Sequence, residues 1–182
     1  KFVVPRPPSL SAAQAAAVSL ALMTAYYGLH TLGRMKKGDR VLIHSAAGGT
    51  GLAAVQLALR AGAVVFATAG SADKRAYLQA LGVEQVMDSR SLDFADEIRT
   101  RTGGRGVDIV LNSLTGPAIE KSLATLAPYG RFIELGKRDI YEDAPLNLGH
   151  FRKKLSYFAV DVAGMLEERT EETAQLLQQV VQ

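Results

Sequence analysis

The residues with the clearest chemical meaning are the small ones at 45–51, S-A-A-G-G-T-G, which follow the apolar run V-L-I at 41–43. Ala46, Gly48 and Gly51 fit the dinucleotide-binding spacing G-x-G-x-x-G, with alanine in the first glycine position. A strand, a glycine turn and a helix start leave free backbone N–H groups, which favour a phosphate. We expect Gly48 to let the backbone approach a pyrophosphate and Gly51 to let helix and strand pack closely. An ordinary glycine-rich turn remains the alternative.

Two other interpretations of the glycine turn are disfavoured. Leu52 occupies the position after the last glycine, where a P-loop for nucleoside triphosphates carries Lys. A methyltransferase would also have a glycine loop after its first strand, but we expect an acidic residue after its second strand. Residues 69–71 read A-G-S and supply none.

The same missing acid bears on which nicotinamide cofactor is bound. An NAD site places Asp or Glu about 20 residues past the glycines, on the ribose 2′-hydroxyl. Here the segment 69–71 ends with a serine, which supplies a hydroxyl. It is followed by Lys74 and Arg75 and, after the third strand, by Arg90. Hydroxyl and cationic groups suit a 2′-phosphate, which favours NADP over NAD. Alternatively Lys74 and Arg75 are solvated, although the helix dipole disfavours cations in a first turn. Asp73 could neutralise part of their charge.

The elements that must position these residues alternate along the chain. Short apolar runs predict strands at 41–43, 64–68, 85–87, 107–111, 131–135 and 155–160. Apolar periodicity and glycine stops predict helices at 12–32 with a break near Gly28, and at 52–61, 71–81, 93–102, 117–126 and 167–181. This order predicts one α/β domain of three layers, a doubly wound parallel sheet of the Rossmann type. Its ligand should lie at the loops after the strands, 44–50, 69–74, 88–90, 112–116 and 136–141.

Composition excludes several other classes of function. The 182 residues are 48% apolar and 21% charged, which is ordinary for a globular protein, and the net charge of +3 is dispersed and gives no case for nucleic acid. With no Cys, disulfides, thiolate zinc sites and a catalytic cysteine are excluded. His30, His44 and His150 lie far apart, outside any metal-ligand motif, so no metal is expected. No apolar run reaches the roughly 18 residues of a membrane span and no signal peptide is seen, so we expect a cytoplasmic protein.

Five segments together carry a family resemblance. They are S-A-A-G-G-T-G-L-A-A-V-Q-L-A (45–58), T-A-G-S-A-D-K-R (68–75), D-S-R-S-L-D-F (88–94), G-G-R-G-V-D-I-V-L-N-S-L (103–114) and G-R-F-I-E-L-G-K-R-D (130–139). They resemble the enoyl reductase domain of modular polyketide synthases and animal-type fatty acid synthases. That domain belongs to the zinc-independent medium-chain dehydrogenase/reductase superfamily. The joint pattern L-N-S-L and L-G-K-R-D is more specific than the glycine motif alone.

The resemblance implies NADPH-dependent reduction of a 2-enoyl thioester carried on an acyl carrier protein. Hydride would go from the nicotinamide to the β-carbon, and the enolate would be protonated at the α-carbon. The implied cofactor contacts fall into three groups along the dinucleotide. The pyrophosphate would meet Ala47, Gly48, Gly49, Thr50 and Gly51; the adenosine phosphate end Ser71, Lys74 and Arg90; and the ribose and nicotinamide Asn112, Ser113, Leu114, Leu135 and Gly136.

The resemblance also implies Lys137 and Asp161 as proton donors. Lys137 follows a strand end and a glycine, where its ammonium could stabilise an enolate or give up a proton. The alternative is a surface lysine paired with Asp139. Asp161 follows a run of strand residues and could instead be a strand-end carboxylate in water.

The resemblance further implies partners. Family members have a substrate-binding domain before the nucleotide domain, so we expect residues 1–10 to be a linker and this chain to be part of a larger reductase within a megasynthase. Leu155, Tyr157 and Phe158 form an apolar run at the expected sheet edge, and we expect homodimers to form there. A quinone oxidoreductase-like enzyme and a non-catalytic NADPH-binding module are the competing functions.

Overall fold

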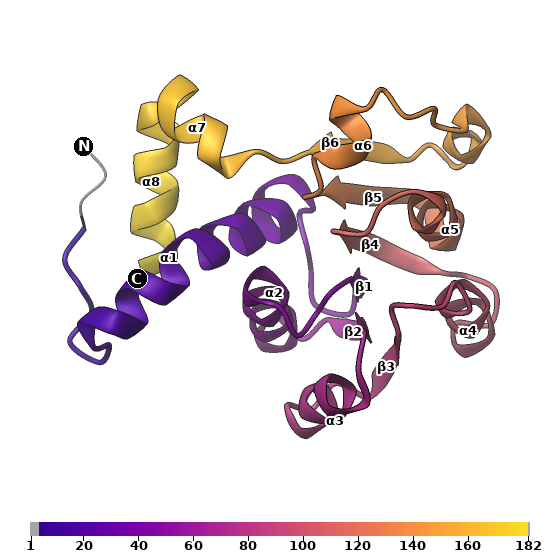
Figure 1. Ribbon diagram of the computed structural model, residues 1–182, viewed down its shortest axis with the longest axis horizontal. Coiled ribbons are helices and arrows are strands. Elements are labelled where there is room, and N and C mark those ends of the chain that lie inside the picture. The colour runs from indigo at the N-terminus through magenta and orange to yellow at the C-terminus, as the bar shows by residue number, and fades with distance from the viewer. Residues whose placement is uncertain (1–3, 182) are drawn as a thin grey trace.

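The fold is a parallel sheet between helices (Figure 1). The computed structural model describes residues 4–181, apart from the side chains of residues 17–19 and 181. The strands are β1 (Arg40–Ile43), β2 (Val64–Ala69), β3 (Gln85–Asp88), β4 (Val107–Asn112), β5 (Leu126–Glu134) and β6 (Ser156–Ala159). They lie in the order β3-β2-β1-β4-β5-β6, and every neighbouring pair is parallel. The predicted doubly wound Rossmann architecture is confirmed.

This strand order fixes where a ligand can bind. From β1 the chain moves outward to β3 and then returns to place β4 on the other side of β1. The switch point therefore lies between β1 and β4, and all strands end at the same edge of the sheet. The crossovers are the helices α2 (Gly49–Arg60), α3 (Ala72–Ala80), α4 (Phe94–Arg101) and α5 (Pro117–Thr125). The five predicted loops thus gather at one edge.

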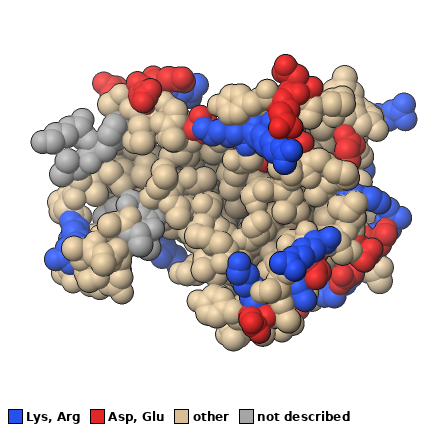
Figure 2. Space-filling view, in the orientation of Figure 1, with Lys and Arg blue, Asp and Glu red and all other residues tan. Residues whose placement is uncertain are grey.

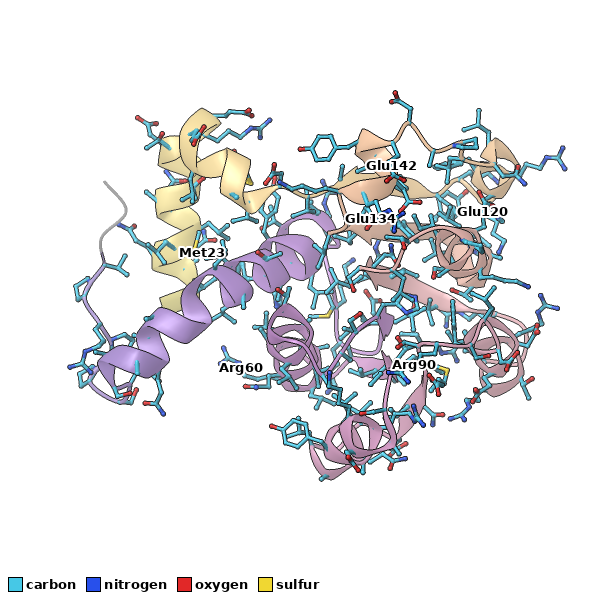
Figure 3. All side chains as sticks on the ribbon, viewed as in Figure 1. Met23, Arg60, Arg90, Glu120, Glu134 and Glu142 are labelled. Carbon is cyan, nitrogen blue, oxygen red and sulfur yellow. The ribbon has the colours of Figure 1, made fainter. Side chains whose placement is uncertain are left out.

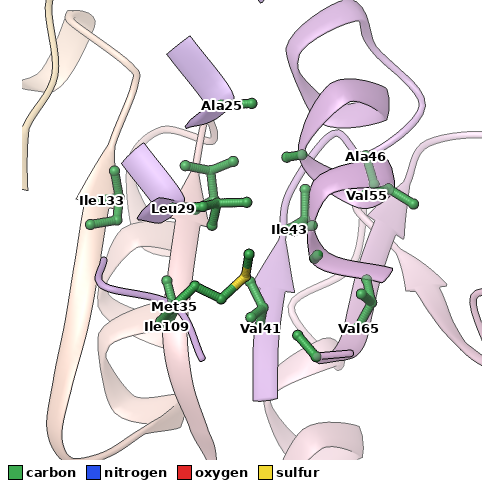
Figure 4. Packing of buried hydrophobic residues seen from close by; sticks show 14 of the residues in the cluster. Ala25, Leu29, Met35, Val41, Ile43, Ala46, Val55, Val65, Ile109 and Ile133 are labelled. Atoms are coloured by element: carbon green, nitrogen blue, oxygen red, sulfur yellow. The ribbon is translucent and has the colours of Figure 1, made fainter. Parts of the chain in front are cut away.

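Two hydrophobic clusters hold the layers together. Val41 and Ile43 of β1 belong to the cluster under α2, and Leu42 between them belongs to the cluster under α4 and α5. All three side chains are fully buried, which is why residues 41–43 form a continuous apolar run. Burying such a side chain contributes about 1.5–3 kcal/mol. Figure 4 shows Val41 and Ile43 packed with Val55 and Leu29 in the first cluster.

The break predicted near Gly28 is a change of helix type. The α-helix α1 (Ala12–Tyr26) continues into the π-helix η1 (Tyr27–Leu32). A Cβ at Gly28 would lie 3.1 Å from the Ile133 side chain and 3.2 Å from that of Leu111. The small residue lets the helix approach β4 and β5 closely. Close packing against the sheet therefore explains why a glycine stands at this position.

The later part of the chain departs from the prediction. Instead of one helix at 167–181 there are two, α7 (Val162–Glu168) and α8 (Thr170–Val181), because Asp161 caps α7 and the chain breaks at Arg169. The stretch expected to be irregular holds two short helices, α6 (Arg138–Tyr141) and the 3-10 helix η2 (Leu148–Lys153). Strand β5 begins at Leu126, earlier than the predicted 131.

The edge strand β6 is less apolar at its surface than its sequence suggests. Leu155 is buried, Tyr157 stacks on Phe132 with ring centroids 5.1 Å apart, and Phe158 packs against the other cluster. The free edge therefore offers mainly backbone groups, which also pair with edges of other chains. Self-association through β6 stays a prediction. Of the expected linker, residues 4–10 have no helix or strand, and residues 1–3 lie outside the described part.

The glycine-rich start of α2 supplies a test of how closely this helix packs against the turn before it. A Cβ at Gly51 would lie 2.4 Å from the Ser45 carbonyl oxygen, whereas one at Gly49 would meet nothing within 4 Å. Gly51→Ala should lower the free energy of unfolding by about 1–3 kcal/mol, because backbone atoms must move apart. Gly49→Ala is the control and should leave stability unchanged or raise it by up to about 1 kcal/mol. Chemical denaturation measures both, and equal stability of the two variants would contradict the packing argument.

Candidate functional site: the carboxyl edge of the sheet

The glycine turn is tightly folded on one side and open on the other. Gly48 is the N-cap of α2, and its N–H donates to the Ser45 carbonyl at 2.8 Å. Gly51 lies against Ser45 and Ala46, as predicted, and Gly49 faces open space. The first N–H groups of a helix have no partner within the helix. An anion placed beside Gly49 could therefore accept hydrogen bonds from the start of α2.

The turn sits across the switch point. The backbone N–H of His44 donates to Leu111 at the end of β4, at 3.0 Å. Two residues later, the N–H of Ala46 donates to Thr68 near the end of β2, at 2.9 Å. The chain that leaves β1 is thus tied to both neighbouring strands before it enters α2, which holds the turn at the centre of the edge.

Of the basic residues after β2, Lys74 and Arg75 differ in their surroundings. Arg75 is partly buried and has two partners: its guanidinium donates to the Ala69 carbonyl at 3.0 Å and pairs with Asp88 at 3.0 Å. Lys74 is exposed, and its N–H points to the Ser71 hydroxyl at 3.4 Å, where Ser71 caps α3. Lys74 therefore has a charge available to a ligand.

Arg90 lies where the sequence placed it, near the end of β2. A Cβ at Gly70 would be 3.4 Å from the Arg90 Nε atom. The Arg90 N–H donates to the Asp88 carboxylate at 2.8 Å, which fixes the loop, while the residue as a whole is exposed. Figure 2 shows Lys and Arg side chains interspersed with Asp and Glu over the region of α3 and β3. We call this side, which carries the exposed Lys74 and Arg90, the cationic side.

The loops after β4 and β5 are joined to each other. The N–H of Leu135 donates to the Asn112 carbonyl at 2.9 Å. The Asn112 side chain is buried and donates to the Glu134 carboxylate at 2.7 Å, and Glu134 also accepts from the Gly136 N–H at 2.7 Å. Residues 113 and 114 stand at the surface beside this network, exposed and half-buried respectively. The residues predicted to line the nicotinamide path are thus brought together.

Glu134 is a site residue that the sequence prediction missed. It is 2% exposed, and burial raises the pKa of its carboxyl to about 7 despite hydrogen bonds from Asn112 and Gly136 that lower it. Burial, followed by the charge of Glu134, raises the pKa of Tyr157 to about 12. The sequence did contain a signal that could have indicated Glu134: a charged residue that ends the strand R-F-I-E, directly before Leu135 and Gly136. In Figure 3, Glu134 lies near the end of β5 and Arg90 near the end of β3, with the end of β1 between them.

Lys137 and Asp161 form an ion pair with Nζ and Oδ2 2.5 Å apart. The alternative pairing of Lys137 with Asp139 is wrong, because Asp139 Oδ1 accepts from the Gly116 N–H at 3.0 Å instead. Asp161 is also not a free strand-end carboxylate: its Oδ1 accepts from the Gly164 N–H at 3.0 Å and caps α7. The hydrogen bond between them raises the pKa of Lys137 and lowers that of Asp161. Both side chains are 43% exposed, so a substrate can reach the pair.

His44 lies at the same edge but is enclosed. Its ring nitrogens contact the Thr68 hydroxyl at 2.9 Å and the Ser122 hydroxyl at 2.8 Å, and its ring meets Phe94 edge-on. Burial lowers the pKa of His44 to about 3, so the ring is neutral at ordinary pH. It links β1, β2 and α5 beneath the glycine turn, and we assign it no contact with a ligand.

Comparison with known proteins places this geometry in a family. Residues 49–182 match the family model of the zinc-binding dehydrogenases. The phthioceranic/hydroxyphthioceranic acid synthase of Mycobacterium tuberculosis is 54% identical over 171 residues, which are 94% of this chain and 8% of that protein. A component of the phenolphthiocerol/phthiocerol polyketide synthase of the same species is 51% identical over 181 residues, 100% of this chain and 8% of that protein.

Solved structures of enoyl reductases are also similar to this chain. The nucleotide-binding subdomain of the enoylreductase domain of PpsC from Mycobacterium tuberculosis has a TM-score of 0.86 and 51% identity, covering 90% of this chain and 92% of that one. The CurK enoyl reductase has a TM-score of 0.82 and 46% identity, covering 97% of this chain and 51% of that one.

The chain therefore belongs to the zinc-binding dehydrogenase family, a class of oxidoreductases. Within it, the chain matches the nucleotide-binding part of polyketide synthase enoyl reductases, as its motifs predicted. It spans about 8% of the length of the curated relatives it matches.

The family's name implies a metal that these residues do not fit. The sequence has no Cys, and residues 4–181 contain no group of three His, Asp or Glu side chains placed to hold a metal ion. Within the same residues, no helix combines the length and apolarity needed to cross a membrane.

The ion pair can be tested by titration. Asp161→Asn should lower the pKa of Lys137, because the hydrogen bond and charge that raise it are lost, while an Asn oxygen can still cap α7. Heteronuclear NMR of the lysine side chains measures this pKa. Asp139→Asn is the control and should change it less, since Asp139 is bonded to the Gly116 N–H. An equal effect of the two substitutions would contradict the observed pairing.

Proposed function

We propose that this chain is the NADPH-binding part of an enoyl reductase that reduces a 2-enoyl thioester during polyketide or fatty acid synthesis. The observation that carries the proposal is the position of the Lys137–Asp161 pair, which shares the carboxyl edge of the sheet with the open glycine turn. The 51% identity to an enoylreductase nucleotide-binding subdomain supports it. A quinone oxidoreductase-like enzyme would share the glycine turn, and nothing in the edge favours it specifically.

The edge fits a dinucleotide in three parts. The start of α2, from Ala47 to Gly51, would bind the pyrophosphate, since Gly49 leaves the approach open. Ser71, Lys74 and Arg90 would bind the adenosine 2′-phosphate on the cationic side. The loops at 112–114 and 135–136 would line the ribose and nicotinamide. NADPH, when bound, supplies the hydride that reaches the β-carbon of the enoyl group.

Lys137 and Asp161 would complete the reaction at the α-carbon. The ammonium of Lys137 carries a proton and a positive charge, which suit an enolate oxygen or carbon. Asp161 holds that ammonium at 2.5 Å and keeps it charged, so we infer that Lys137 is the donor and Asp161 orients it. A proton lost to the substrate would be replaced from water, since both side chains are partly exposed.

The partners follow from the same proposal. The substrate is an enoyl group on an acyl carrier protein, and the neighbours are other domains of one cytoplasmic megasynthase, with the reductase paired as a homodimer. The chain spans 51% of the CurK enoyl reductase, and we expect the part of such an enzyme that it does not span to hold the acyl chain. We therefore expect this chain alone to bind NADPH and to reduce nothing appreciable, because turnover needs the enoyl group at near-attack distance.

Cofactor preference tests the binding half of the proposal. The chain should bind NADPH about 10–100-fold more tightly than NADH, because only NADPH has the 2′-phosphate that receives charge-assisted contacts. This range is already reduced to account for the partial exposure of those contacts to water. Lys74→Ala should weaken NADPH binding about 10-fold and leave NADH unchanged. Fluorescence titration at fixed salt measures both. Lys121→Ala, an exposed lysine on α5, is the control; equal affinity of the wild type for NADH and NADPH would refute the assignment.

Turnover tests the catalytic half. In an intact enoyl reductase containing this chain, Lys137→Ala should lower turnover about 10²-fold, the low end for a general acid, with NADPH affinity unchanged. Arg138→Ala is the matched control, because Arg138 carries the same charge next to Lys137 but pairs with Glu142, the C-cap of α6. Steady-state rates with an enoyl thioester measure the effect. Unchanged turnover would remove Lys137 from the mechanism.

A further inference from the structure

One buried carboxylate joins the two loops that we propose for the nicotinamide. Glu134 ends β5, and its two oxygens accept hydrogen bonds from the two loops, one oxygen from each loop. Oε2 accepts from the Asn112 side chain, after β4, at 2.7 Å. Oε1 accepts from the Gly136 N–H, after β5, at 2.7 Å. Besides the Leu135 N–H bond to the Asn112 carbonyl, the two oxygens of one side chain thus hold the loops together.

The amide of Asn112 has one orientation in this network. Its Nδ2 atom donates to the Leu114 carbonyl at 2.9 Å as well as to Glu134. Its Oδ1 atom accepts from the Leu114 N–H at 3.3 Å. A flipped amide would turn an oxygen toward the carboxylate and lose both bonds to Leu114. The turn at 112–114 is thus coupled to the ionised form of Glu134.

We propose that Glu134 is a positioning residue of the reductase: its ionised carboxylate holds the loops at 112–114 and 135–136 in the arrangement that binds NADPH, and protonation releases them. The inference rests on the proposed function, because it assumes that these loops line the nicotinamide. Glu134 itself is buried and is assigned no contact with the cofactor.

Protonation changes the count of acceptors. The ionised carboxylate offers acceptors on both oxygens, while the neutral acid carries an O–H donor on one of them. A proton on the lone pair that accepts from Asn112 or from Gly136 would face a donor, and a proton on either oxygen makes that oxygen a weaker acceptor. The conflict is relieved when one loop moves or when the Asn112 amide flips and gives up the turn at Leu114.

The surroundings of Glu134 place this change near neutral pH. Burial raises its pKa to about 7, and the charge of Asp139 on α6 acts in the same direction. The donors Asn112 after β4, Gly136 after β5 and Tyr157 on β6 act in the opposite direction. The carboxylate is ionised above about pH 7 and neutral below it, so NADPH should bind more weakly on acidification. By reciprocity, NADPH should lower the titration midpoint of Glu134.

NMR of the wild-type chain tests the coupling without a mutation. The amide signals of Gly136 and Leu114 should titrate together with a midpoint near pH 7 in the free chain. Saturating NADPH should shift that midpoint downward by about 0.7 pH unit, which corresponds to a roughly five-fold difference in affinity between the two forms. Amide signals that do not titrate between pH 6 and pH 8, or a midpoint that NADPH leaves unmoved, would overturn the proposal.

Two matched substitutions separate positioning from folding. Glu134→Gln puts an amide NH₂ against one of the two donors, so NADPH binding at pH 8 should weaken about five-fold or more and lose the part of its pH dependence due to Glu134. Glu120→Gln is the control, because Glu120 also accepts a backbone N–H, from Asn147 at 2.9 Å, and contacts His150 at 2.7 Å, but bonds to neither loop of the proposed nicotinamide site. It should keep the wild-type affinity and pH dependence, including any contribution from the 2′-phosphate.

The outcomes distinguish this inference from the proposed function. If the wild type binds NADPH and Glu134→Gln matches Glu120→Gln at every pH, the positioning role is wrong and the proposed function stands. If the wild type binds no NADPH at pH 6 or pH 8, the proposed function fails and the inference falls with it. If Glu134→Gln is unfolded by circular dichroism, the wild-type NMR midpoints with and without NADPH decide.

Discussion

The close contact between Gly51 and the turn at Ser45 and Ala46 is the constraint on which the edge depends. A helix that starts against the end of a buried strand must bring its backbone within van der Waals distance of that strand, and a side chain at Gly51 leaves no room for this. The contact aims the start of α2 across the switch point. Hydrogen bonds from His44 to β4 and from Ala46 to β2 then fix the turn from both sides. The ligand-facing position, Gly49, is left open as a result.

The remaining parts of the edge are arranged around that turn by charge. On the β2 and β3 side, Asp88 pairs with the Arg75 guanidinium and accepts a hydrogen bond from the Arg90 backbone N–H. The side chains of Lys74 and Arg90 remain exposed to solvent. On the β4 and β5 side the only strongly buried carboxylate of the described residues, Glu134, is surrounded by donors. One side thus presents exposed cations, and the other a network of donors around one carboxylate.

Sequence reasoning reached the parts of this arrangement that are local. The fold, its strand ends and the glycine turn follow from apolar runs such as 41–43 and from glycines at fixed spacing, and each was predicted to within a few residues. Lys137 and Asp161 were each named through a resemblance, but their pairing was not predicted, because it depends on how the end of β5 and the start of α7 meet. Glu134 was missed because a charged residue at a strand end is usually exposed. The boundary between α7 and α8 was missed because Asp161 was predicted only to follow a strand, and its role as the N-cap of α7 was not recognised.

That double use of Asp161 ties the acidity of a lysine to the integrity of a helix in another part of the chain. One oxygen of the carboxylate starts α7 and the other binds the ammonium of Lys137. If the first turn of α7 frays, the carboxylate loses the bond that aims it, and Lys137 returns toward the basicity of a free amine. The ammonium therefore reports on the local order of α7, and any contact that steadies or loosens that helix also sets how strongly the lysine holds its proton.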